Sequence, residues 1–106
     1  MAARYSVDLT TTADKELSRI RRGQPRDAER LEAAMVALSE TPHPPGCTPL
    51  MNLSGVWRIR DGDGDGDGDG DYRIWYTIDK GVLIVLALLI HTRDDVYPQL
   101  RRLLGR

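Results

Sequence analysis

The sequence lacks the features that mark secreted and membrane proteins. It has a single cysteine, Cys47, which excludes an internal disulfide framework and favours a reduced compartment. The longest apolar run, Val82 to Ile90, is too short for a membrane-spanning helix, which needs roughly 20 residues. Arg4 is followed by an alternating segment rather than by the apolar core of a signal peptide. We therefore expect one cytoplasmic domain, residues 1–106, with no membrane partner.

The net charge of −1 is also small, but it combines two regions of opposite sign. Six of the 16 acidic residues lie in an alternating Asp-Gly run from Asp61 to Asp71. Without them, 15 basic residues stand against 10 acidic ones, so the body of the chain is basic. A basic body suits nucleic acid, because neutralising phosphates releases counterions. Taken alone, the charge is explained equally well by an ordinary soluble surface.

The first half of the chain predicts a strand followed by a helical hairpin. Residues 5–9 alternate apolar and polar side chains, as in a half-buried strand. Thr11 and Asp14 approximate a capping box, so a helix should begin near Thr11 and end at Gly23. Pro25 suits the first turn of a second helix. Apolar stripes follow on the two helices: Ala13, Leu17 and Ile20, then Ala28, Leu31, Met35 and Leu38.

The second half predicts strands. The proline-rich segment 41–46 cannot be helical. Residues 53–60 and 72–79 carry alternating patterns, and Val82 to Ile90 is apolar throughout, as in a central strand covered on both faces. Asp79-Lys80-Gly81 reads as a tight turn, with glycine available for a positive φ.

A short helix should close the chain. Asp94 or Asp95 can cap it, and Val96, Leu100 and Leu103 would point inward. The resulting order is β-α-α-β-β-β-α. We therefore expect an α+β fold with a mainly antiparallel sheet packed against the helical hairpin.

The candidate site is a set of cationic side chains from neighbouring strands. Arg58 and Arg60 project from one face of their strand, and Arg73 joins them if the next strand pairs in suitable register. Arg93 and Tyr97 arrive from the segment after the apolar strand. Four guanidiniums and a phenol on one surface suit a polyanion, whereas each arginine taken singly fits a surface ion pair equally well.

Trp75 has two interpretations. If it shares a face with Arg73, it can stack on an RNA base, but core packing explains it as well. His43 lies between prolines without an acidic neighbour, and we expect an ordinary loop histidine. Cys47, in the same loop, carries no signal of a nucleophile.

The Asp-Gly run, residues 61–71, cannot bury apolar area to offset its ordering entropy, so we expect a flexible hairpin loop. Asp61, Asp63 and Asp65 followed by Gly66 imitate the start of an EF-hand loop, but the twelfth position is Tyr72 rather than glutamate. We expect no specific calcium site. The loop adjoins Arg60 and Arg73 within about one Debye length of roughly 8 Å, so it can compete with phosphate for them.

Nearly the whole chain resembles the RelE/ParE toxins of type II toxin–antitoxin systems. The resemblance rests on the opening strand, the helical hairpin, Val-Trp-Arg-Ile-Arg, Gly-Asp-Tyr-Arg-Ile-Trp-Tyr, a buried strand and His-Thr-Arg-Asp-Asp-Val-Tyr. The Asp-Gly run departs from the family, whose members usually connect those strands in a few residues. The RelE branch is the most similar, although it often has lysine where this chain has Arg58 and Arg60, and arginine is a planar fork rather than a mobile point charge.

The resemblance implies an mRNA endoribonuclease that acts in the ribosomal A site without metal or other cofactor. It further implies a cognate antitoxin partner and a toxin–antitoxin hetero-oligomer. The family likeness gives Arg58, Arg60 and Arg73 the role of stabilising the phosphorane. It gives Tyr97 a part in deprotonating the 2′-OH, and Arg93 the leaving oxygen. Two alternatives stay open: a ParE-like inhibitor of DNA gyrase without nuclease activity, and an inactivated module that binds its antitoxin.

Overall fold

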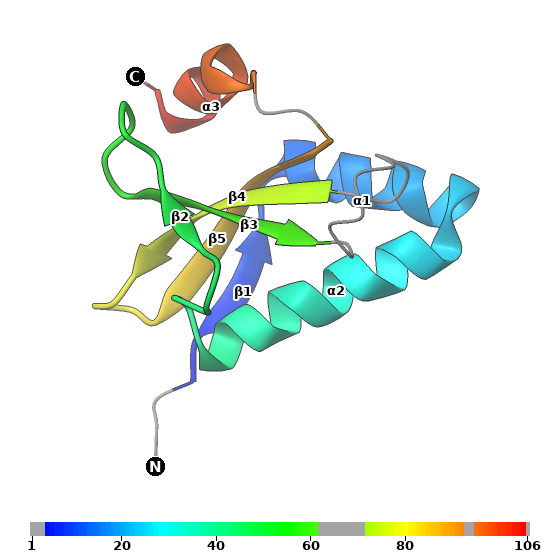
Figure 1. The fold of residues 1–106 in the computed structure, drawn as a ribbon, viewed down its shortest axis with the longest axis horizontal. Coiled ribbons are helices and arrows are strands. Elements are labelled where there is room, and N and C mark those ends of the chain that lie inside the picture. Colours follow the sequence, from blue (N-terminus) through cyan, green and yellow to red (C-terminus); the bar gives the residue numbers. More distant parts are fainter. Residues whose placement is uncertain (1–3, 62–71, 93–94, 106) are drawn as a thin grey trace.

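The computed structural model describes residues 4–61, 72–92 and 95–105 (Figure 1). The elements are, in chain order, β1 (Ser6–Leu9), α1 (Thr11–Gly23), α2 (Pro25–Glu40), β2 (Thr48–Pro49), β3 (Val56–Asp61), β4 (Tyr72–Asp79), β5 (Ile84–His91) and α3 (Tyr97–Leu104). The predicted α+β order is confirmed, with the two-residue strand β2 added after the proline-rich segment. The predicted Asp-Gly loop lies outside the described residues from residue 62 onward.

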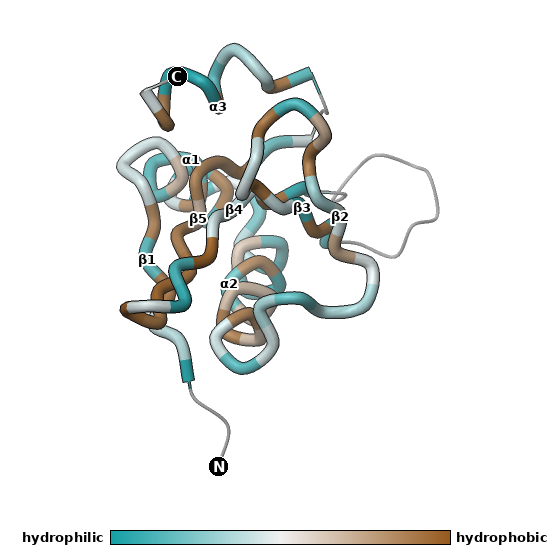
Figure 2. Tube along the Cα trace, turned by 90° about the vertical axis from the view of Figure 1, so that its left-hand side faces the viewer, coloured by the Kyte–Doolittle hydropathy of each residue, from teal (hydrophilic) through white to brown (hydrophobic). Residues whose placement is uncertain are grey.

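One five-stranded sheet has the order β1-β5-β4-β3-β2. β1 pairs with β5 in parallel, and the other neighbours pair antiparallel. β5 is therefore flanked on both sides, and most of its residues are hydrophobic (Figure 2). Its apolar composition follows from this central place, because both of its faces contact a core.

The helical hairpin covers one face of the sheet, which we call the hairpin face. All the residues of the two predicted apolar stripes are buried there against Ile59, Ile74 and Tyr76. Trp57 packs on the edge of this core. The helical periodicity thus predicted the buried faces of α1 and α2 correctly.

A local signal marks the start of each helix in the hairpin. Thr10, rather than Thr11, is the N-cap of α1, and its hydroxyl accepts from the backbone N–H of Ala13 at 3.1 Å. The same hydroxyl donates to the carbonyl of Leu88 at 2.6 Å, which ties the helix start to the sheet. Pro25 occupies the first turn of α2 as predicted.

A smaller core lies on the opposite face, under α3; we call this the α3 face. Val56, Trp75, Leu88 and Leu100 are buried there. Val96, which lacks a side-chain hydrogen-bonding group, is the N-cap of α3, so the expectation that Asp95 caps this helix was wrong. Asp94, the other expected cap, lies outside the described residues.

The turn between β4 and β5 differs from the prediction in its backbone. The positive φ falls at Leu83 (57°) and not at Gly81. Asp79 stabilises the turn instead, because its Oδ1 accepts from the N–H groups of Gly81 (2.9 Å) and Val82 (3.2 Å). As a result β5 begins at Ile84, two residues later than the apolar run, and Val82 is exposed.

Candidate functional site

A row of basic residues crosses three adjacent strands on the α3 face. Arg60 on β3 is paired with Arg73 on β4, and Arg73 is paired with His91 on β5. Neighbouring strands lie roughly 4.8 Å apart, so the backbone of this row spans about 10 Å. The register that the sequence left open therefore places Arg60 and Arg73 side by side. We call Arg58, Arg60, Arg73 and His91 the basic row.

Arg58 joins the row from the next position on the same face of β3. It lies two residues before Arg60 and opposite Trp75. Arg58 is half-buried and Arg60 is exposed. Their side chains thus share the α3 face with Val56, as predicted from the alternation of the strand.

Trp75 shares this face with Arg73, but its side chain is almost completely enclosed. It is 2% exposed and packs with Leu53, Val56 and Leu100 in the core under α3. A ring enclosed in this way presents no open face to a base. The buried position therefore favours core packing over the base-stacking interpretation.

Arg73 is oriented by the backbone that follows β5. Its Nη1 donates to the carbonyl oxygen of Thr92. A half-buried guanidinium held by a backbone carbonyl loses fewer rotamers when it meets an anion, which preorganises it. Arg93, the next residue in the sequence-predicted set, lies outside the described residues.

Tyr97 is the first residue of α3 and is half-buried against the core of the α3 face. Arg73 and Trp75 alternate to this same face, so the phenol and the arginines lie on one side of the sheet. The fold therefore brings five of the six sequence-predicted residues to one face: Arg58, Arg60, Arg73, Trp75 and Tyr97.

His91 is a candidate that the sequence analysis missed. It ends β5, is half-buried, and lies opposite Arg73. An apolar strand has no alternation from which to read the face of its last residue. A β-bulge decides it: Trp75 pairs with Leu89 and Tyr76 with Ala87, so Leu88 is an extra residue and the faces shift beyond it.

The comparisons with known proteins identify the family. Residues 7–96 match the model of the ParE toxin of type II toxin–antitoxin system, parDE. The chain belongs to this toxin family. No curated protein matches the sequence.

Solved toxin structures share the fold. The chain is 28% identical to one from the toxin–antitoxin complex RelBE2 of Mycobacterium tuberculosis, covering 85% of this toxin and 99% of that chain at a TM-score of 0.67. A mutant of the free E. coli RelE toxin is 16% identical over 97% of both chains, with a TM-score of 0.71. The YoeB/ParE toxin of Agrobacterium tumefaciens is 15% identical, covering 84% and 99%, with a TM-score of 0.70. The expected RelE/ParE superfamily membership is thereby confirmed.

The strand ends that flank the Asp-Gly run are attached to α2 on the hairpin face. Asp61 is paired with Tyr72, whose hydroxyl donates to Asp27 Oδ2 at 3.1 Å. Arg30 reaches Asp27 at 2.8 Å and Asp61 at 3.4 Å. Burial, together with the hydrogen bond to Asp27, raises the pKa of the Tyr72 phenol. These contacts hold the side chains of Asp61 and Tyr72 on the face opposite the basic row.

The described residues were searched for metal sites and for membrane-spanning helices. Among residues 4–61, 72–92 and 95–105, no group of three or more His, Cys, Asp or Glu side chains is arranged to hold a metal ion. Within the same ranges, no helix has the length and apolar character needed to cross a membrane. His43 is exposed and meets the ring of Trp57 edge-on, with 4.4 Å between centroids.

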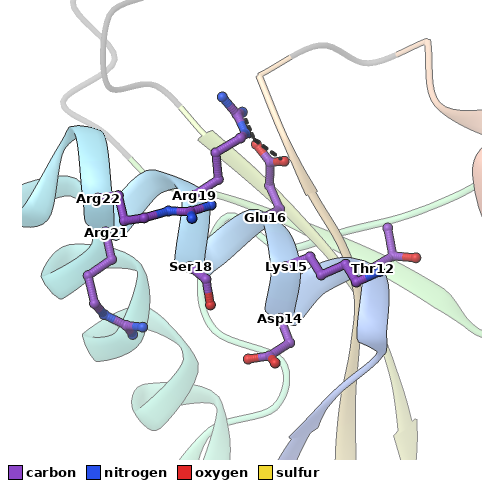
Figure 3. Close-up of a pocket in the computed structure, with 8 residues that line it drawn as sticks. All are labelled: Thr12, Asp14, Lys15, Glu16, Ser18, Arg19, Arg21 and Arg22. Atoms are coloured by element: carbon purple, nitrogen blue, oxygen red, sulfur yellow. Dashed lines mark hydrogen bonds and ion pairs between the residues drawn. The ribbon is translucent and has the colours of Figure 1, made fainter.

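A hollow of about 740 Å³ lies away from the basic row, along α1 (Figure 3). It is lined by Thr12, Asp14, Lys15, Glu16, Ser18, Arg19, Arg21 and Arg22. It contains none of the sequence-predicted site residues. The hollow is therefore separate from the basic row.

Proposed function

We propose that this toxin is a ribosome-dependent mRNA endoribonuclease that blocks translation. The observation that carries the proposal is the basic row: Arg60, Arg73 and His91 side by side, with Arg58 beside them and Tyr97 on the same face. Side chains of this kind suit a scissile phosphodiester, which needs positive charge around it and proton transfer on two sides.

The proposed reaction needs no metal. The ribose 2′-oxygen attacks the adjacent phosphorus and forms the 2′-O–P bond, while the bond from phosphorus to the 5′-oxygen of the next nucleotide breaks. The products are a 2′,3′-cyclic phosphate and a 5′-OH. Arg58, Arg60 and Arg73 stabilise the charge that develops on the phosphorane, and each well-placed donor contributes about 3 kcal/mol.

Proton transfer requires a base for the 2′-OH and an acid for the leaving 5′-oxygen. Family likeness assigns the first role to Tyr97 and support of the leaving oxygen to Arg93. Arginine keeps its proton at all ordinary pH values and is a poor acid. We assign the donation of that proton to His91, because histidine is the side chain best suited to proton exchange near neutrality and because it lies opposite Arg73.

The proposed protein partner is a cognate antitoxin. Structures similar to this toxin were solved as toxin–antitoxin complexes, from Mycobacterium tuberculosis, E. coli and Pyrococcus horikoshii. We propose that this chain likewise forms a hetero-oligomer with an antitoxin. The mRNA in the ribosomal A site is the proposed substrate of the free toxin.

The second candidate function is inhibition of DNA gyrase without nuclease activity. It is favoured by the family model that matches, which describes the ParE toxin. The basic row favours the nuclease instead, because a protein inhibitor of another enzyme has no need of cations aligned with a histidine and a tyrosine. The third alternative is an inactivated module that retains its antitoxin as a partner.

The deciding experiment is expression without an antitoxin, followed by mapping of mRNA 5′ ends. We expect arrested growth with new 5′-OH ends in translated messages. Arg60→Gln should lower cleavage by about 100-fold, since one transition-state donor is lost. Lys80→Gln, which removes an exposed charge at the β4–β5 turn, should cleave normally. Arrest with intact mRNA and broken DNA would support the gyrase alternative, and the absence of arrest would support the inactive module.

A second measurement tests the proton donor. An acid must be protonated to act, so the cleavage rate of the parent should fall with rising pH. His91→Gln should lower the rate and remove this fall. If the pH profile keeps its shape in the variant, the assignment of His91 is wrong while the role of the arginines stands.

A further inference from the structure

Four side chains form a polar network where α2 meets the ends of β3 and β4. The hydroxyl of Tyr72 donates to Asp27 Oδ2 at 3.1 Å, and Arg30 Nη1 donates to Asp27 Oδ1 at 2.8 Å. The Nε of Arg30 also lies 3.4 Å from Asp61 Oδ2. Figure 1 shows β3 ending beside α2, where these contacts form. We call Asp27, Arg30, Asp61 and Tyr72 the α2 clamp.

The carboxylates of the α2 clamp are shielded from water. The side chains of Asp27 and Asp61 are 15% and 16% exposed, whereas that of Arg30 is 44% exposed. Burial, together with the hydrogen bond to Asp27, raises the pKa of the Tyr72 phenol, which therefore remains a donor at neutral pH. Without Arg30, two shielded carboxylates would lose the cation that joins them, and such a loss is costly.

The α2 clamp lies one residue beyond the paired arginines of the basic row. Asp61 is paired with Tyr72, and the next pair along the two strands is Arg60 with Arg73. Successive side chains of a strand point to opposite faces, so the clamp is on the hairpin face while the arginines project from the α3 face. Consecutive residues are joined by rigid peptide units. Fixing the first pair therefore restricts the second.

This end of the paired strands has little other support. Like charges directly opposite each other destabilise a strand pair, and Arg60 and Arg73 are both cations. The ten residues that join the strands, 62–71, are all glycine or aspartate, which are poor strand formers. A connection of this length does not set the register as a two-residue turn does. The alignment of the two arginines thus depends on neighbouring side-chain contacts.

The apolar core already holds α2 on the sheet. The stripe of α2 is buried in the core of the hairpin face and consists of Ala28, Leu31, Met35 and Leu38. Ion pairs that include a partly exposed side chain add little to the stability of such a core. What distinguishes the α2 clamp is its point of attachment, the strand ends that carry the basic row.

We propose that the α2 clamp positions Arg60 and Arg73 side by side for the proposed cleavage reaction. Its helical members, Asp27 and Arg30, act from the hairpin face by holding the two strand ends together. This inference rests on the proposed nuclease function, to which it adds positioning residues that do not touch the RNA. A displacement of about 1 Å at a reacting centre can cost about 100-fold in rate, so the clamp acts on kcat rather than on RNA capture.

The first test is the variant Arg30→Gln, with Arg26→Gln as a matched control that removes an exposed guanidinium one turn earlier on α2. Hydrogen exchange measures the opening of the strand ends and requires no cleavage. Arg30→Gln should speed exchange in segments 59–61 and 72–74 about 10-fold, because a charged hydrogen-bonding partner is lost. Exchange in β1 and in the control should match the parent. Tyr72→Phe, which removes one hydroxyl of the clamp, should act in the same direction and provides the test if Arg30→Gln is unstable.

Steady-state cleavage of ribosome-bound mRNA measures the positioning itself. Corrected for the folded fraction, Arg30→Gln should lower kcat about 10-fold and leave KM unchanged, since the arginines remain present but lose their alignment. Arg30→Lys, which keeps a cation, should restore part of kcat. In an Arg60→Gln background the further loss should be at most about 3-fold, because residues that act together are not additive. A full 10-fold further loss would indicate a purely structural role.

The outcomes distinguish this proposal from the nuclease function on which it rests. Unchanged exchange at the strand ends in both Arg30→Gln and Tyr72→Phe would overturn the positioning role, whether or not the toxin cleaves RNA. Faster exchange with an unchanged kcat would overturn it as well. If the parent does not cleave RNA but its strand ends open faster in Arg30→Gln, the nuclease function alone is refuted and the clamp still aligns the arginines.

Discussion

The two faces of the sheet are built differently. Two helices cover the hairpin face, and its core draws on α1, α2, β3, β4 and β5. The α3 face carries one eight-residue helix over a smaller core, and the basic row occupies the end beyond it. A charged side chain is costly to bury, so the row requires an uncovered part of the sheet. The hairpin face thus provides most of the stability, and the α3 face combines a limited core with the proposed site.

A cavity in the hairpin core should have the largest effect on stability. Leu31 is completely buried there. Leu31→Ala should lower the free energy of unfolding by about 3 kcal/mol and affect all elements together. Chemical denaturation followed by tryptophan fluorescence and by circular dichroism should give coincident transitions. A loss below about 1 kcal/mol would show that the hairpin core relaxes around the cavity.

An equivalent cavity on the α3 face should act locally. Leu100 is completely buried under α3, and a helix of eight residues is unstable without its packing. Leu100→Ala should cost about 2 kcal/mol, chiefly by releasing α3 and displacing Tyr97. Hydrogen exchange should then show faster exchange in α3 with β4 and β5 protected as before. Uniformly faster exchange would mean that the two cores unfold as one unit.

The hairpin core contains a buried tyrosine, Tyr76, and removing its hydroxyl should destabilise the protein less than either cavity. The hydroxyl of Tyr76 donates to the carbonyl of Pro42 at 2.7 Å. Burial and the nearby Cys47 raise the pKa of this phenol. Tyr76→Phe should cost about 1 kcal/mol at pH 7.

The pH dependence of that difference has a definite sign. In the unfolded chain a tyrosine ionises near pH 10, whereas the folded protein retains the proton. The parent therefore loses stability as pH rises above about 10, and the variant lacks this loss. The difference between parent and variant should shrink between about pH 10 and 11 in denaturation experiments. A constant difference would argue against the raised pKa.

The smallest expected effect concerns the acidic run that joins β3 and β4. Shortening it to a single Asp-Gly unit should raise RNA affinity a few-fold at low salt, because fewer carboxylates compete for Arg60 and Arg73. The effect should vanish at high salt. Replacing the run by an uncharged Ser-Gly repeat of the same length controls for loop length. Equal affinity of all three proteins at low salt would exclude competition.

Helical elements were predictable because their signals are local. The spacing of Ala28, Leu31, Met35 and Leu38 on α2 is a repeat that needs no partner to be read. Caps were less reliable. Thr10 holds the N-cap position of α1, where the sequence pointed to Thr11, and Val96 holds that of α3, where it pointed to Asp94 or Asp95. The two-residue strand β2 had no repeat at all and forms by pairing with β3.

The face that each side chain occupies on its own strand was predictable, but the pairing between strands was not. Alternation placed Arg58 and Arg60 on one face, and Trp75 on the face of Arg73. It left the pairing of Arg73 undetermined, because register depends on contacts between distant segments. The burial of Trp75 was likewise decided by the helix that covers it.

By itself the sequence determined the order of elements, the helix faces, the basic character of the body and the residue types of the proposed site. The tertiary structure decided that Arg60, Arg73 and His91 form one row. The physical reason is that side-chain periodicity can be read from consecutive residues, whereas register depends on which residues of separate strands pair. One extra residue at Leu88 moves His91 from the hairpin face to the face of the arginines.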